Sequence, residues 1–142
     1  MTDPVEPYPV PAEDADNRPM LEAWRGGRLL LPACRDCGRL FFYPRPLCPH
    51  CWSDALDWRA ACGRGRIVAF SLVRRPNHAA FFPEAPIVMA EIRLEEAVAM
   101  LARIVEVDAG SVRSGMPVEA LPLPQASRYP LPTFRPMACQ TT

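Results

Sequence analysis

Two segments in the second half of the chain alternate apolar and polar residues. In segment 86–94, one face carries Val88, Ala90, Ile92 and Leu94, and in segment 98–107 one face carries Val98, Met100, Ala102 and Ile104. A period of two residues is typical of strands that bury one face. The residues Glu95–Ala97 between the two segments are polar enough for a turn, so the pattern predicts an antiparallel hairpin.

Three further segments, 67–73, 115–121 and 133–136, have the short length and branched apolar residues of strands. No long helix is expected between any two of the five strands. Five short strands in this arrangement predict a small barrel, and small five-stranded barrels are often OB-folds that bind ligands on one face and in the loops. The expected fold class is therefore mainly β.

A segment with the periodicity of a helix precedes the predicted barrel. Asn17 is a candidate N-cap, Met20, Leu21 and Trp24 follow at helical spacing, and Gly26 and Gly27 end the run. A helix of two to three turns is not stable alone in water, so its apolar face must dock on another surface. That surface is either the barrel of this chain or a partner subunit, and in the second case Trp24 is a candidate partner contact.

Cysteine spacing gives the strongest chemical signal. Cys34 and Cys37 form one Cys-x-x-Cys pair, and Cys48 and Cys51 form a second pair after ten intervening residues. Two such pairs predict a zinc ribbon with a tetrahedral, four-thiolate Zn²⁺ site. Four protein ligands leave no open position for water or substrate, so the expected role of the zinc is structural.

The residues around the cysteines suggest how the ribbon is built. Residues 39–43 look strand-like, and Trp52, Leu56 and Trp58 are expected to seal the ribbon against the barrel. Arg45 lies between Pro44 and Pro46, which fixes the direction of its side chain. Arg45 either makes a salt bridge or hydrogen bond within the ribbon, or contacts an anionic ligand.

Composition limits the possible functions. The chain has 142 residues and no net charge, and all 16 basic residues are arginine. Without lysine, a Schiff base or a P-loop is excluded, and a neutral chain with 8% aromatic residues is a poor match for a single-stranded nucleic-acid-binding module. No run of apolar residues approaches the length of a membrane span, and no export signal is evident. We therefore expect a cytoplasmic location with the cysteines in reduced form.

The chain divides into four expected segments. Residues 1–16, with four prolines and five acids, form an acidic arm that is either disordered or ordered by contact. Residues 17–60 hold the helix and ribbon, 61–123 the barrel, and 124–142 an extended C-terminal tail.

An irregular segment, 74–85, interrupts the barrel. Long loops inside compact domains are usually functional, and this one contains Arg74, Arg75, His78, Phe81 and Phe82. Such a mixture could hold an anionic head and an apolar tail, as in an acyl thioester of coenzyme A, or it could stack bases. Alternatively, the phenylalanines simply cover the mouth of the barrel.

Taken together, these motifs resemble those of the zinc-ribbon and OB-fold proteins called "domain of unknown function 35". The resemblance runs from about Met20 to Pro136. It is carried by both cysteine pairs, by Trp58, and by the segments 42–45, 63–65, 86–90, 115–118 and 131–134.

The resemblance implies an auxiliary subunit that accompanies thiolase-fold enzymes, namely thiolases, acyltransferases and aldolases. It also implies a rubredoxin-like ribbon, and a barrel shaped for acyl-CoA. The catalytic residues would then lie on the partner. The residues agree with this expectation, because the chain offers only two histidines and no persuasive Ser-His-Asp or Cys-His set. The alternative remains a single-stranded nucleic-acid-binding module.

Overall fold

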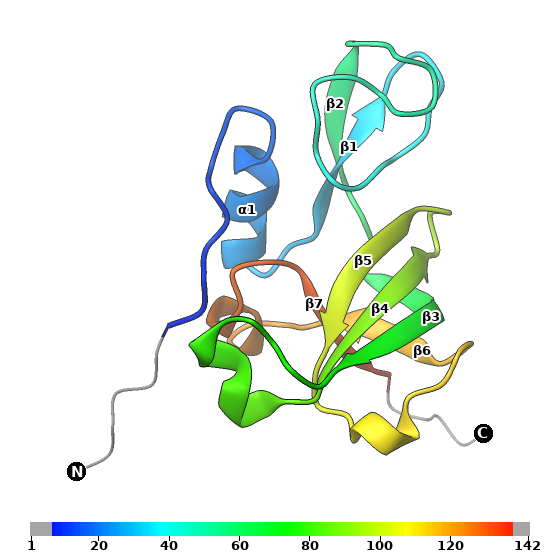
Figure 1. Ribbon diagram of the computed structural model, residues 1–142. Helices are drawn as coiled ribbons and strands as arrows, with labels where there is room; N and C mark the ends of the chain where they lie inside the picture. Colours follow the sequence, from blue (N-terminus) through cyan, green and yellow to red (C-terminus); the bar gives the residue numbers. More distant parts are fainter. Residues whose placement is uncertain (1–6, 138–142) are drawn as a thin grey trace.

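The computed structural model describes residues 7–137, and it has a short helix and a ribbon beside a closed barrel (Figure 1). The helix α1 spans Arg18–Arg25. The ribbon contains β1 (Leu30–Cys34) and β2 (Leu56–Ala60), which pair antiparallel. The mainly β class, with helix, ribbon and barrel in that order, is as predicted. No helix within residues 7–137 is long and apolar enough to cross a membrane.

Five strands form the barrel in the order β3-β4-β5-β7-β6, and β6 pairs with β3 to close it. They are β3 (Arg64–Val73), β4 (Ile87–Leu94), β5 (Ala99–Ile104), β6 (Pro117–Ala120) and β7 (Thr133–Pro136). The β5–β7 pair is parallel, and the other pairs are antiparallel. The barrel thus includes part of the segment 124–142 that the sequence assigned to a C-terminal tail.

The predicted hairpin is β4–β5, and its apolar faces are buried as expected. Ala97 in the turn has a positive φ of 63°. In the described part of the chain there are also three short 3-10 helices: η1 (Ala79–Glu84), η2 (Ala109–Ser111) and η3 (Gln125–Arg128). Segment 74–85 is therefore less irregular than predicted, because η1 occupies half of it.

The helix docks on its own chain, which decides between the two predicted alternatives. Met20 and Leu21 lie in the same core as Leu31 of the ribbon and Ile92 of the barrel. Trp24 is 1% exposed, packs beside Leu121 and donates from Nε1 to the Tyr129 carbonyl at 2.9 Å. Trp24 is thus a core residue, and its predicted contact with a partner is wrong.

Asn17 lies at the N-cap position but does not cap the helix with its side chain. Its Oδ1 accepts from the Asp14 backbone N–H at 2.9 Å, and its Nδ2 donates to the Ala12 carbonyl and to the Tyr43 hydroxyl. Asn17 therefore links the N-terminal arm to the ribbon. Residues 7–16 of the arm are ordered by contact, while residues 1–6 lie outside the described residues.

Two predictions for the ribbon are wrong. Residues 39–43 form no strand, and only a single bridge joins Leu40 to Ala33. Trp52 is 77% exposed and does not seal the ribbon. It follows the second cysteine pair in a tight turn with φ of 66°, whereas Leu56 packs against the cysteines and Trp58 against the main core.

Candidate functional site

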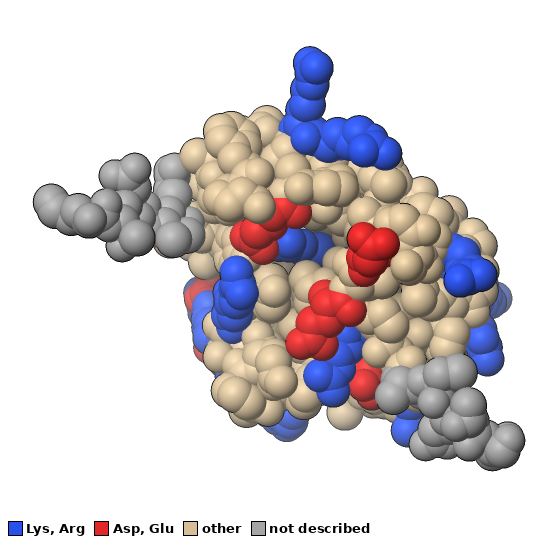
Figure 2. All heavy atoms as spheres, turned by 90° about the horizontal axis from the view of Figure 1, so that it is seen from below, with Lys and Arg blue, Asp and Glu red and all other residues tan. Residues whose placement is uncertain are grey.

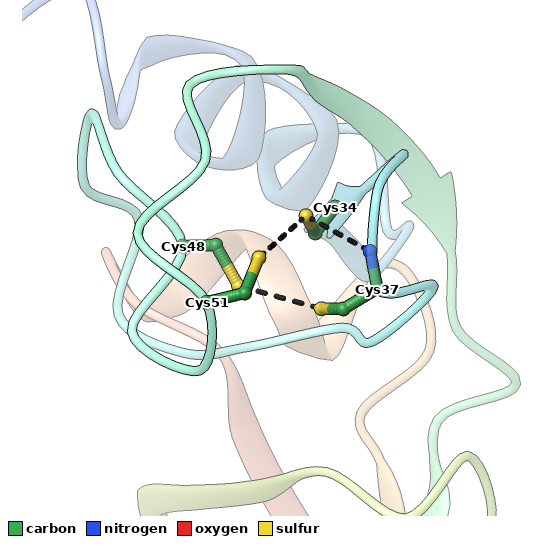
Figure 3. A group of neighbouring side chains, drawn as sticks. All are labelled: Cys34, Cys37, Cys48 and Cys51. Atoms are coloured by element: carbon green, nitrogen blue, oxygen red, sulfur yellow. Dashed lines mark hydrogen bonds between the residues drawn. The ribbon is translucent and has the colours of Figure 1, made fainter.

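The four cysteines meet at one point between the two turns of the ribbon. Figure 3 shows their side chains pointing toward one another from opposite loops. All four sulfur atoms lie within 4.8 Å of one another, with 3.5 Å between Cys34 and Cys51 and 3.6 Å between Cys37 and Cys48. Zn–S bonds of about 2.3 Å in a tetrahedron require sulfur atoms about 3.8 Å apart. The arrangement fits zinc.

Two similar turns build the site. The Gly38 N–H donates to the Cys34 carbonyl and the Trp52 N–H donates to the Cys48 carbonyl, both at 2.9 Å. In each turn a backbone N–H also donates to the first sulfur, from Cys37 to Cys34 and from His50 to Cys48, both at 3.4 Å. The residue after each pair, Gly38 or Trp52, has a positive φ, which bends the chain so that both sulfurs face inward.

The electrostatics of the four thiols also favour a cation. The Cys37 backbone N–H lowers the pKa of Cys34 to about 7. The Ser53 backbone N–H favours the Cys51 thiolate, but the sulfur of Cys34, with the other nearby sulfurs, raises the pKa of Cys51 to about 12. Four thiolates therefore do not coexist easily without a positive charge among them, and Zn²⁺ supplies that charge.

Cys34, Cys37, Cys48 and Cys51 form the structural zinc site of the ribbon. Because all four ligands come from the protein, the metal braces two turns and offers no coordination position to a substrate. Cys62 lies elsewhere and is exposed.

An apolar groove of about 580 Å³ lies on the outside of the barrel, beside the predicted loop. Its walls come from β4 and β5, from the loop before η1, from the arm and from the segment before β7. Phe81 and Arg75 line it, as do the exposed side chains of Leu101 and Leu131. Most of this lining is apolar.

Tyr8 of the arm is one of the residues that line the groove. Its ring stacks on Phe81 at 5.3 Å and on Tyr129 at 5.7 Å between ring centroids. Its hydroxyl donates to the Glu84 carboxylate at 2.6–2.8 Å. The arm, η1 and the segment after η3 are thereby held together.

Arg103 of β5 lies beneath this aromatic cluster. Its Nη2 donates to Glu84 Oε1 at 2.9 Å, and its guanidinium group lies 5.7–5.8 Å from the ring centroids of Tyr129 and Phe81. Its Nε and Nη1 are buried and have no hydrogen-bond partner among the described residues. Although burial opposes the charge on Glu84, the Tyr8 hydroxyl and Arg103 hold its pKa below the ordinary value.

The structure separates the residues that the sequence grouped in the loop. Arg75 and Phe81 line the groove, whereas Arg74 and the 59%-exposed Phe82 are not among its lining residues. His78 caps η1, because its Nδ1 accepts from the Ala80 N–H at 3.1 Å. Arg45 lies on the ribbon, where its Nε donates to the Tyr43 carbonyl at 3.2 Å.

Sequence reasoning missed Tyr8, Glu84, Arg103 and Tyr129. Arg103 occupies an outward position of a strand, so the alternating pattern assigns it to solvent. Residues of η1 and the segment after η3 lie over that outer face, with Phe81 and Tyr129 against the Arg103 guanidinium group. The single available signal was the aromatic residue Tyr8 within a proline-rich acidic segment.

Fold and metal site together define the class: this is a zinc-ribbon and OB-fold protein with an N-terminal helix. Family models agree, because residues 21–57 match the rubredoxin-like zinc ribbon domain of ChsH2 and residues 58–121 match its C-terminal OB-fold domain. The chain belongs to the ChsH2 family of DUF35 proteins, as the sequence motifs suggested.

Solved structures give the same result. The chain resembles one in the "Ltp2-ChsH2(DUF35) aldolase" with 34% identity and a TM-score of 0.74, over 89% of this chain and 98% of that chain. A DUF35 protein of unknown function from Sulfolobus solfataricus has 15% identity and a TM-score of 0.57, over 84% of this chain and 83% of that chain. The second similarity shows the fold alone.

Curated relatives include longer proteins. A "Probable enoyl-CoA hydratase alpha subunit" of Thermomonospora curvata is 34% identical over 93% of this chain, which spans 41% of that protein. A "DUF35 domain-containing scaffold protein" of Pyrococcus furiosus is 33% identical over 65% of this chain, which spans 66% of that protein. The relatives thus carry the names of subunits and scaffolds.

Proposed function

We propose that this chain is a non-catalytic auxiliary subunit that docks on a thiolase-fold enzyme, such as an acyltransferase, thiolase or aldolase. It supports the assembly of that enzyme and the access of acyl or acyl-CoA substrates. The observation that carries the proposal is the similarity to the ChsH2 chain of an aldolase complex over 98% of that chain. The scaffold names of the archaeal relatives support the same role.

The chemistry of the described residues agrees with a non-catalytic role. The zinc ligands are complete, and each histidine has a local partner, with His50 beside Arg39 and His78 at the cap of η1. A reducing compartment keeps the cysteines available as thiolates for zinc. We therefore also propose the cytoplasm as the location.

The apolar groove supports the part of the proposal that concerns acyl groups. It is about 580 Å³ in volume and is bordered by Leu101 and Leu131, which are 60% and 38% exposed. A contiguous apolar surface that is open to solvent commonly marks a site that a ligand or a partner covers. In the complex, the groove would lie along the path of the acyl chain to the partner's active site.

Co-expression with a thiolase-fold enzyme encoded by a neighbouring gene tests the proposal. We expect the two proteins to elute together in size-exclusion chromatography and the activity of the enzyme to rise in the complex. Separate elution with unchanged activity would contradict the subunit role.

A pair of variants tests the role of the groove within that complex. Leu101→Gln, at the border of the groove, should raise the KM for a long acyl substrate severalfold while the complex still forms, because an apolar contact with the chain is lost. Trp52→Gln is the control, since Trp52 is also an exposed apolar side chain but lies on the ribbon, away from the groove. An equal KM in both variants would mean that the groove does not contact the substrate.

A further inference from the structure

A hollow of about 380 Å³ lies at the end of the barrel that is remote from the ribbon. Its lining comes from the end of β5 and the residues after it, from the start of β4, and from η1 and η3. Figure 1 shows the ribbon beside the other end, where the β4–β5 hairpin turns. Seen from below, acidic and basic side chains are intermixed around a hollow at this remote end (Figure 2).

The floor of the hollow is apolar. Val88, Ile104 and Leu121 line it, and each of them is at most 3% exposed. Arg103 and Tyr129 line both this hollow and the apolar groove, so they form a wall that the two cavities share. The lining contains no serine, cysteine or histidine, which favours a site that binds a ligand without converting it.

The part of the rim near η1 and η3 has an excess of positive charge. Arg103 and Arg128 share a single carboxylate, that of Glu84, at 2.9 Å and 3.8 Å from their Nη2 atoms. Arg103 Nε and Nη1 are buried without a hydrogen-bond partner within residues 7–137, and buried donors in native proteins rarely stay unpaired. Two guanidinium groups and one carboxylate leave one positive charge uncompensated.

The residues after β5 give another part of the rim the opposite charge. Glu106 lines the hollow with a half-exposed side chain. Its Oε2 lies 3.4 Å from Nη1 of Arg135, but the same guanidinium group also donates from Nε to Glu119 at 3.1 Å. One guanidinium group between two carboxylates leaves one negative charge uncompensated. The hollow is therefore dipolar, although the charges of this network sum to zero.

We propose that this hollow binds a small zwitterion of the ω-amino acid type, with a carboxylate and an ammonium group on a short aliphatic chain. The carboxylate lies against Arg128, with the charge of Arg103 behind it, and the ammonium group lies against Glu106. Pairs of ionised donors and acceptors of this kind are stronger than neutral hydrogen bonds. The methylene groups cover the apolar floor, and the volume suits a small-molecule site. A ligand with only one charge compensates only one part of the rim.

An NMR titration of the zinc-loaded, ¹⁵N-labelled full chain tests this site. The probes are γ-aminobutyrate and ε-aminocaproate, which differ in the separation of their charges, and caproate and hexylamine, which each lack one charge. We expect saturable shifts of the backbone amides of residues 104–107 and 125–129 with at least one zwitterion. Each singly charged probe should bind about tenfold more weakly, since it loses one charged contact.

Two variants of opposite charge separate recognition of the ligand from a merely structural role. Arg128→Gln and Glu106→Gln should each weaken binding of the zwitterion about tenfold. For caproate the effects should have opposite signs, because Arg128→Gln removes an attraction and Glu106→Gln removes a repulsion. Both side chains are exposed, so the fold should persist, and the zinc content and the spectrum of each variant check this.

Arg113→Gln and Glu91→Gln are the matched controls. Both residues are exposed, have no ion pair within residues 7–137 and do not line the hollow. Unchanged affinity in both controls supports the site. An equal loss in a control and in the rim variant of the same charge would mean that binding follows net charge alone, and this result would overturn the proposal.

Three results with the wild-type chain would also overturn it. Equal affinity for caproate, hexylamine and the zwitterions would mean that only the apolar floor is recognised. Shifts at Leu101 and Leu131, without shifts at residues 104–107, would place the ligand in the groove. No saturable shift at millimolar probe concentration would mean that water alone satisfies the rim. Because the titration uses this chain alone, none of these results bears on the proposed subunit role.

Discussion

Glu84 is the residue through which three distant parts of the chain are connected. Its carboxylate accepts from Tyr8 of the arm and from Arg103 of β5, and it lies 3.8 Å from Arg128 of η3. Burial alone would raise its pKa, but the Tyr8 hydroxyl and the two arginines hold the pKa below its ordinary value. The charged form of Glu84 is therefore the form that the native state stabilises.

This coupling predicts a dependence of stability on pH. The pKa of Glu84 is lower in the native state than in the unfolded state. The contribution of its charge to the free energy of unfolding is therefore present at neutral pH and is lost as the pH falls through the native-state pKa. Glu84→Gln should lower the free energy of unfolding by about 2 kcal/mol at pH 7, and the difference from wild type should shrink toward pH 3. Urea unfolding monitored by fluorescence at both pH values measures it.

Glu91→Gln serves as the control for this prediction. Glu91 is exposed on β4 and has no ion pair within residues 7–137, so its replacement should change stability little at either pH. A deficit in Glu84→Gln that is the same at pH 7 and pH 3 would show that the carboxylate charge does not stabilise the cluster.

At the scale of elements, β3 is longer than the apolar pattern indicates. The predicted strand began at residue 67, whereas β3 begins at Arg64 and includes Gly65. A Cβ on Gly65 would lie 2.4 Å from the Arg93 carbonyl oxygen of β4. Gly65 therefore allows β3 to pair with both β4 and β6 at the point where the barrel closes.

Gly65→Ala should consequently be among the more damaging single substitutions in the barrel. The clash is with backbone, which cannot move aside without disturbing the β3–β4 pairing, and we expect a loss of about 3 kcal/mol in the free energy of unfolding. Thermal unfolding followed by circular dichroism measures the change. Gly110→Ala is the control, because a Cβ there meets only the Asp108 side chain at 3.4 Å; equal stabilities of the two variants would refute the role of Gly65.

Elements with a strong periodic or spacing signal were predictable, and elements formed by distant contacts were not. Alternating residues gave the β4–β5 hairpin, and cysteine spacing gave the zinc ligands. By contrast, an apolar residue such as Trp24 suits a core face and a docking face equally well, so the sequence does not distinguish the two. Its burial depends on Leu121 and Tyr129, which follow about a hundred residues later. The aromatic cluster around Arg103 likewise forms only when segments that are distant in the sequence come together.

At the scale of the whole molecule, helix, ribbon and barrel share one core. Leu21 of α1, Leu31 of β1 and Ile92 of β4 belong to the same buried cluster. The boundary between the two family matches, at residues 57 and 58, lies within β2. We therefore expect the chain to unfold in a single transition, with the zinc site included in the cooperative unit.

Replacement of one zinc ligand tests this cooperativity. Cys48→Ser should abolish stoichiometric zinc in metal analysis and should lower the stability of the barrel as well as of the ribbon, by about 4 kcal/mol. Cys62→Ser is the control and should retain one zinc per chain, because Cys62 lies outside the metal site. A Cys48→Ser protein with a barrel transition at the wild-type temperature would show that the two parts unfold independently.

The position of β7 has a consequence for synthesis on the ribosome. Although β7 is the last strand within residues 7–137, it lies between β5 and β6 in the closed barrel. The barrel cannot close until residues 133–136 have left the exit tunnel. All four zinc ligands lie within the first 51 residues and therefore leave the tunnel earlier. The nascent ribbon can therefore bind its metal first. Part of its apolar surface then stays exposed to solvent until β7 completes the core.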